Sequence, residues 1–162
     1  MPSLRLMAVA GCLAATAAVA QEELPAIAMV EVEVDLASVE ANALDYWPRI
    51  ERDLTEAILA VADPMLSENG YIVDIQVSEI SLEGLAVLPE TGEFNRLEGW
   101  VYVRAEEGAA PIKSEQIALD AQSYIPGGNS QFYIIPGRPD FYVALVNVFA
   151  TRVVEEVVEL GS

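Results

Sequence analysis

Apolar and acidic residues alternate strictly near the start of the chain. Positions 30 to 36 read Val-Glu-Val-Glu-Val-Asp-Leu, so every second side chain is apolar. This period of two is typical of a half-buried β-strand, because successive side chains of a strand point to opposite faces. We therefore expect a strand here, with its apolar face on a core and with Glu31, Glu33 and Asp35 facing water.

After Pro48 the apolar residues recur at helical spacing. They form one side of a predicted amphipathic helix that runs to about Met65. Pro48 suits the first turn of that helix, where its missing N–H costs no hydrogen bond. Asn69-Gly70 is a typical stop signal. We expect Tyr46 and Trp47, just before the helix, to pack back onto the core.

Period-two patterning returns over residues 71 to 83. Its apolar face shifts by one residue near Ser78-Glu79, which predicts a β-bulge there. Residues 97 to 105 read as a partner strand, and the two are expected to pair as a long antiparallel hairpin. A further strand is expected near residues 114 to 121.

The last part of the chain predicts a long helix from about Asp140 to Leu160. Its apolar stripe consists of Tyr142, Leu145, Val146, Phe149, Val153, Val157 and Leu160. Valine has low helix propensity, so burial against the sheet must hold this helix. The segment before it, residues 123 to 139, is broken by Pro and Gly and carries an apolar insert over residues 132 to 135.

The order strand, helix, three strands, helix predicts an α+β fold. A two-layer sandwich, with a mostly antiparallel sheet of about four strands and two helices on one face, buries every apolar stripe. We expect residues 29 to 162 to form this single domain, preceded by a flexible stretch over residues 21 to 28.

The first twenty residues are expected to be a secretory signal peptide. One Arg precedes a long apolar run, and Ala18-Val19-Ala20 is a small-x-small cleavage pattern. The run is too short for a permanent membrane span. Cleavage after Ala20 would leave a periplasmic or secreted chain with no integral membrane segment. The alternative is a lipoprotein acylated at Cys12, because Val9-Ala10-Gly11-Cys12 resembles a lipobox, although its apolar segment would be short.

The amino-acid composition excludes several kinds of catalytic and metal site. The 162 residues contain no His and one Cys, which excludes Ser-His-Asp and Cys-His nucleophile systems and His-ligated metals. The 26 acids against 8 bases give a formal net charge of −18. Nucleic acids and anionic membranes are bound through Lys and Arg, so we expect neither as a partner.

The abundant carboxylates leave two alternatives open. Acids of neighbouring strands could join Glu31, Glu33 and Asp35 to hold Ca²⁺, although no calcium-loop motif is present and such acids are usually the wet face of a strand. A hydrolase-like enzyme could use two carboxylates as acid and base, and Asp74, inside an apolar run, is the nearest candidate. Because the alternation places Asp74 outward, we assign no catalytic residue. Because no calcium-loop motif is present, we assign no metal site, and we assign no cofactor.

Alternate residues of the predicted strand 97–105 are large and aromatic or basic: Trp100, Tyr102 and Arg104. If the valines between them face the helices, these side chains lie on the other face of the sheet. Trp, Tyr and Arg are enriched at binding surfaces, so we interpret the three as candidate partner- or ligand-binding residues. The alternative is that the segment over residues 123 to 139 folds over them, since exposed aromatic patches are uncommon in soluble monomers.

The apolar insert supplies the remaining candidates, Phe132, Tyr133 and Ile135. Its Pro and Gly flanks resemble hinges. The insert is therefore expected to be an edge strand, a packed loop, or a lid or docking strand that accepts another chain by β-addition.

Together these features favour an exported, acidic, non-enzymatic binding or adaptor domain. Its partner would be an envelope protein or a small ligand, bound on the sheet face away from the helices. A hydrolase-like enzyme that uses only carboxylates and a Ca²⁺-dependent envelope module are the alternatives.

Overall fold

The computed structural model describes residues 24–35, 42–82, 87–120 and 138–161. The expected signal peptide, Cys12 and the insert residues Phe132, Tyr133 and Ile135 lie outside these ranges and stay predictions. Within the described ranges, no helix combines the length and the apolar character needed to cross a membrane.

Four strands form one sheet in the order β1-β2-β3-β4. Their bounds are β1 Ile27–Val34, β2 Tyr71–Ser81, β3 Arg96–Arg104 and β4 Lys113–Asp120. β1 runs parallel to β2, whereas β2, β3 and β4 pair antiparallel. β1 begins at Ile27, earlier than the alternation predicts, and Ile27 is paired with Tyr71 and almost fully buried. The strand therefore includes the end of the stretch that was expected to be flexible.

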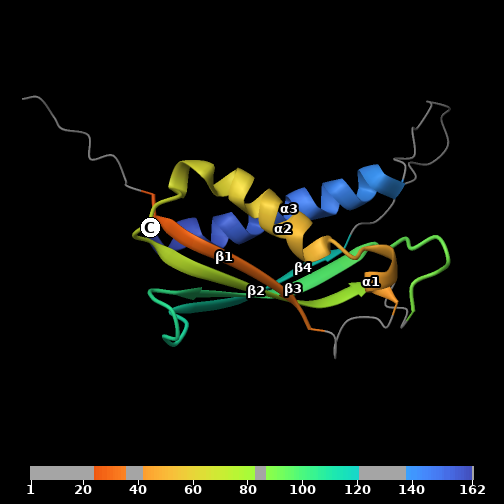
Figure 1. The fold of residues 1–162 in the computed structure, drawn as a ribbon, viewed down its shortest axis with the longest axis horizontal. Helices are drawn as coiled ribbons and strands as arrows, with labels where there is room; N and C mark the ends of the chain where they lie inside the picture. The colour runs from red at the N-terminus through yellow and green to blue at the C-terminus, as the bar shows by residue number, and fades with distance from the viewer. Residues whose placement is uncertain (1–23, 36–41, 83–86, 121–137, 162) are drawn as a thin grey trace, which may run out of the picture.

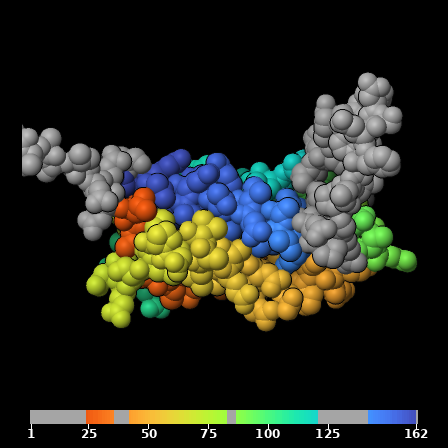
Figure 2. Space-filling model, turned by 90° about the horizontal axis from the view of Figure 1, so that it is seen from above, coloured from red at the N-terminus to blue at the C-terminus, as the bar shows by residue number. Residues whose placement is uncertain are grey.

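Two long helices, α2 Ile50–Ala62 and α3 Arg138–Val158, lie side by side on one face of this sheet (Figures 1 and 2). The short elements are α1 Ala43–Tyr46 and the 3₁₀ helices η1 Asp63–Met65 and η2 Glu159–Gly161. The α+β fold with two helices on a mostly antiparallel sheet is thus confirmed. Pro48 lies in the turn before α2 rather than in its first turn, so its position in the helix was predicted wrongly.

The core lies between the helix layer and the inner face of the sheet. Rows of β-branched residues cross β1, β2 and β3 in register, for example Val32, Ile75 and Val101. The expected bulge is present, because the register between β2 and β3 shifts between Val77 and Glu79. The bulge returns Ile80 to the buried face, which explains the phase change in the sequence.

Gly99 makes room for the centre of α3. Phe149, from the predicted apolar stripe, is fully buried. A Cβ added at Gly99 would lie 3.0 Å from Phe149 Cζ and 3.1 Å from the Gln76 carbonyl oxygen. Side-chain carbons rarely approach so closely, so the missing Cβ lets α3 lie close to β3.

Trp47 anchors the chain at the entry to α2. Its ring stacks on Tyr142 of α3 with centroids 4.1 Å apart, and Phe94 meets both rings edge-on. The Trp47 Nε1–H donates to the Gly92 carbonyl oxygen at 2.8 Å. The expected packing of Trp47 onto the core is confirmed, and the same side chain ties the loop before β3 to the helix layer.

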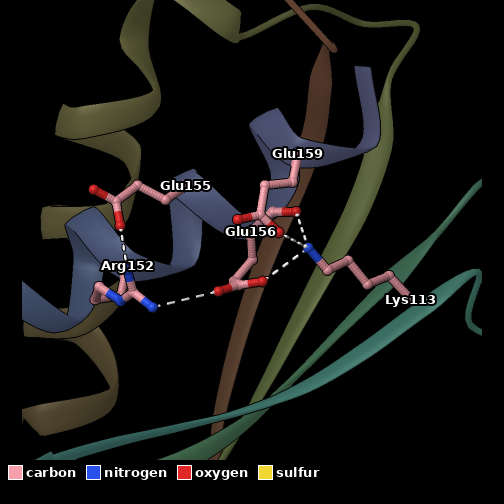
Figure 3. Close-up of polar contacts among 5 residues, drawn as sticks. All are labelled: Lys113, Arg152, Glu155, Glu156 and Glu159. Carbon is pink, nitrogen blue, oxygen red and sulfur yellow. Dashed lines mark hydrogen bonds and ion pairs between the residues drawn. The ribbon is translucent and has the colours of Figure 1, made fainter. Parts of the chain in front are cut away.

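An ion-pair cluster fastens β4 to the end of α3 (Figure 3). Lys113 Nζ lies 2.8 Å from Glu156 Oε2 and 2.9 Å from Glu159 Oε2, and it donates to the Glu156 carbonyl oxygen at 2.8 Å. Burial lowers the pKa of Lys113, but the two carboxylates outweigh burial and raise it. Lys113 in turn lowers the pKa of Glu159.

Candidate functional site

The sheet face opposite the helices presents every second residue of β3. These residues are Arg96, Glu98, Trp100, Tyr102 and Arg104. The valines between the last three are buried under the helices. The structure therefore places the candidates Trp100, Tyr102 and Arg104 on the same face, away from the core. We call this face, with the outward residues of the other three strands, the open face.

Two rows of side chains cross the open face. The first row consists of the register partners Glu31, Asp74, Tyr102 and Ser114. The second row consists of Glu33, Gln76, Trp100 and Gln116. Neighbouring strands lie about 4.8 Å apart, and residues two apart on a strand are separated by about 7 Å. Each row therefore carries a carboxylate on β1 and an aromatic ring two strands away on β3.

The two aromatic rings of β3 stack on each other. The centroids of Trp100 and Tyr102 are 6.4 Å apart and their planes differ by 16°. Trp100 is 38% exposed, whereas Tyr102 is half-buried. The Arg104 guanidinium carbon lies 5.9 Å from the Tyr102 ring centroid, within reach of a cation–π interaction. We call the stacked Trp100 and Tyr102 rings the aromatic platform, and Arg104 lies beside it.

Arg104 also forms an ion pair with Asp74 on the neighbouring strand. Asp74 points outward, as its place in the alternation predicts. A proton-donating acid of a hydrolase needs apolar surroundings, whereas Asp74 lies against a guanidinium. The contact instead fixes the arginine beside the Tyr102 ring.

A second polar cluster lies at the other end of the open face. Arg96 Nε lies 2.7 Å from Glu98 Oε1 and 3.3 Å from Glu79 Oε1. Gln116 Nε2 donates to Glu98 Oε2 at 3.3 Å, which links β4 to the cluster. The hydrogen bond that Arg96 donates to Glu98 and the charges of Glu79 and Glu98 raise the pKa of Arg96. Arg96 is therefore already paired with carboxylates of its own sheet.

A depression of about 270 Å³ lies between β1 and Tyr102 of the aromatic platform, and the Arg104 side chain also lines it. Asp74 and Gln76 form its floor, and Tyr102 faces Glu31 and Glu33 across it. Among the described residues, neither Glu31 nor Glu33 makes a side-chain hydrogen bond or an ion pair. Both are exposed, so the depression has one wall of unpaired carboxylates.

A larger hollow of about 620 Å³ lies on the helix side, between the start of α2 and the first half of α3. Trp47 and Tyr142 line it, and the Tyr142 hydroxyl donates to Asp53 Oδ2 at 2.8 Å. Burial and the nearby Asp53 charge raise the pKa of Tyr142. The sequence pattern predicts only a packing role for Trp47 and Tyr142. No local pattern could have found this hollow, because Asp53 and Tyr142 are 89 positions apart.

In the part of the chain that the structure describes, no group of three or more His, Cys, Asp or Glu residues is arranged to hold a metal ion. The candidates Phe132, Tyr133 and Ile135 fall outside that part, so their position relative to the open face stays a prediction.

Comparisons with known proteins include a distant likeness to a solved structure. No protein-family model matches the chain, and no curated protein matches it. One solved structure, the rare lipoprotein B from Shewanella oneidensis, aligns over 82% of this chain and 92% of its own, with 13% identity and a TM-score of 0.26. A TM-score this low carries no argument about fold or function.

Proposed function

We propose that this chain is an exported, non-enzymatic binding domain whose open face receives a partner protein. One observation carries the proposal: a stacked Trp100–Tyr102 pair lies on the sheet face that α2 and α3 do not cover. The export signal and the envelope location of the partner rest on the sequence of residues 1 to 20.

The aromatic pair is not needed to build the described core. Val101 and Val103, on the opposite side of β3, are 1% and 0% exposed and already close the helix side of the strand. An indole that is 38% exposed keeps part of its large apolar surface open, and this part can serve as contact area for a partner. Truncation of a Trp or Tyr at the centre of an interface typically costs about 2 kcal/mol or more of binding energy.

The flanks of the pair suit a specific interface. Arg104 and Asp74 hold each other on one side, and Arg96, Glu79 and Glu98 form a network on the other. Side chains that are held before binding lose less conformational entropy when a partner arrives. An aromatic centre with a fixed polar rim is the usual anatomy of a protein-binding surface.

Position-specific photo-crosslinking in cells tests the proposal. Trp100→p-benzoylphenylalanine puts a crosslinking side chain on the open face, and Val148→p-benzoylphenylalanine puts the same group on α3, where Val148 is 50% exposed. We expect a discrete adduct from position 100 and none of the same mass from position 148. Equal adducts from both positions, or none from position 100, would reject the open face as the binding surface.

A further inference from the structure

The open face carries an excess of negative charge around its aromatic platform. Its carboxylates are Glu31, Glu33, Asp74, Glu79, Glu98 and Asp120, and its arginines are Arg96 and Arg104. Both arginines are already paired with acids of the same face. Among the described residues, Glu31 and Glu33 on β1 and Asp120 on β4 form no ion pair, so a partner that covers the platform meets uncompensated carboxylates, two of them on β1.

The geometry of the depression suits a cationic side chain. A cation between β1 and the platform would meet Glu31 or Glu33 on one side and the Tyr102 ring on the other. The two walls are two strand spacings apart, about 10 Å, which a Lys or Arg side chain bridges with its alkyl stem and its charged head. Arg104 also lines the depression, but its charge is balanced by the ion pair with Asp74, so Glu31 and Glu33 are left to attract an incoming cation.

The spacing of the two rows suits an extended segment. Glu31 and Glu33 lie two residues apart on β1, as Tyr102 and Trp100 do on β3. Both pairs therefore repeat at about 7 Å, which is also the repeat of side chains on one face of an extended chain. Two basic residues at positions i and i+2 of a strand-like segment would enter the two rows together.

Other occupants fit this face less well. A second copy of this chain would bring a face of the same negative net charge against the first, and like charges that face each other repel. An apolar partner would bury the two carboxylates without a counter-charge, which is costly. Charge complementarity therefore selects a basic partner.

We infer that the open face binds a basic, extended segment of another protein, with Lys or Arg side chains inserted between the β1 carboxylates and the Trp100–Tyr102 pair. This inference rests on the proposed function and adds the chemistry of the partner.

A peptide titration tests the inference. The probe is a fluorescent peptide of eight residues that alternates Lys and Ser, and the control peptide alternates Glu and Ser. The protein is expressed from all 162 residues, and binding is followed by fluorescence anisotropy at low and high salt. We expect the Lys peptide to bind and the Glu peptide not to bind. Because exposed charges are screened, we expect affinity for the Lys peptide to fall about tenfold or more between 20 mM and 500 mM salt.

A matched pair of variants separates the site from overall charge. Glu31→Gln with Glu33→Gln removes the unpaired wall, and Glu90→Gln with Glu93→Gln removes the same charge from exposed positions in the loop that Trp47 ties to the helix layer. We expect the first variant to weaken binding of the Lys peptide by about tenfold, as for two exposed ion pairs, and the second to change it less than twofold. Equal losses in both variants, or no binding of the Lys peptide, would overturn the inference.

Two further results would show which part of the account fails, the assignment of a protein segment or the basic chemistry of the partner. If spermidine displaces the peptide at an equal concentration of amines, the site takes any small polycation, and the assignment of a protein segment is wrong. If position 100 still crosslinks to a partner while salt and the Glu31/Glu33 variant have no effect, the proposed function stands and the inference about basic chemistry fails. Loss of the crosslink itself would count against the proposed function.

Discussion

The ion pair between β4 and α3 gives a sharp test of how the two layers are held together. Glu156 is only 7% exposed, and Lys113 reaches it from the sheet (Figure 3). Lys113→Met removes the positive charge and leaves the carboxylate nearly buried. Removing one partner of a buried pair typically costs about 3–5 kcal/mol. Arg152 remains 3.7 Å from Glu156, and the Lys113 side chain is 19% exposed, so we expect a smaller loss, about 2 kcal/mol.

A double-mutant cycle isolates the interaction. We expect Lys113→Met, Glu156→Gln and their combination to give a coupling energy of about 1–2 kcal/mol, measured by chemical denaturation. The matched control is the pair Arg152 and Glu155, whose side chains are each 51% exposed and lie 2.7 Å apart. Its coupling should stay near 0.5 kcal/mol, about the value for exposed helical pairs. A Lys113–Glu156 coupling no larger than this control would refute the view that burial makes the pair strong.

Three further predictions follow from contacts in the core and from the shifted pKa values. The pKa of Glu159 is lowered, so its contribution to stability is present above its unfolded value of about 4.5 and is lost as the pH falls through the folded value. The pKa values of Lys113 and Tyr142 are raised, so their contributions are present below about pH 10 and are lost as the pH rises further. The difference in unfolding free energy between the wild type and Lys113→Met should therefore be largest between about pH 5 and 10, and a difference that does not change with pH would contradict these assignments. Gly99→Ala should lower the unfolding free energy by about 1–3 kcal/mol in urea denaturation, because the new Cβ meets Phe149 and the Gln76 carbonyl oxygen, and an unchanged value would mean that α3 shifts freely. Tyr142→Phe should cost about 1 kcal/mol in the same assay, because it removes the hydrogen bond to Asp53, and no loss would show that the bond adds nothing.

Much of the fold can be predicted from the sequence, because the apolar residues of each long strand or helix recur at the spacing typical of that element. The alternation over residues 30 to 36 identifies β1, and the one-residue phase change in β2 locates the bulge that the register confirms between Val77 and Glu79. The predicted apolar stripe is buried from Tyr142 to Val157, whereas its last member, Leu160, lies in η2 and is half-buried. These signals are local, so one sequence suffices to find them.

Features set by non-local pairing could not be found in this way. The parallel pairing of β1 with β2 and the order of the strands depend on which segments meet, and no local pattern states that. The helix α1 has four residues and is too short to show a period. The burial of Glu156 depends on Lys113, which lies 43 positions away on β4.

The same difference between local patterns and non-local pairing applies to the candidate site. Alternation was enough to put Trp100, Tyr102 and Arg104 on one face, because the side-chain period of a strand is two. Register was needed to show that Asp74 pairs with Arg104 and that Glu31 and Glu33 lie across from the rings. The chemistry of the depression is therefore a property of three strands together and not of any one of them.

The open face as a binding surface is the central claim, and one crosslinking measurement tests it most directly. Gln116→p-benzoylphenylalanine places the crosslinker beside Trp100, its register partner, without altering the aromatic pair. The same probe is then combined with Trp100→Ala and Tyr102→Ala. We predict that the adduct disappears while the chain still folds, with the unfolding free energy lowered by about 2–4 kcal/mol, because both rings are partly buried. An adduct that persists without the pair, or a chain that no longer folds without it, would contradict the claim.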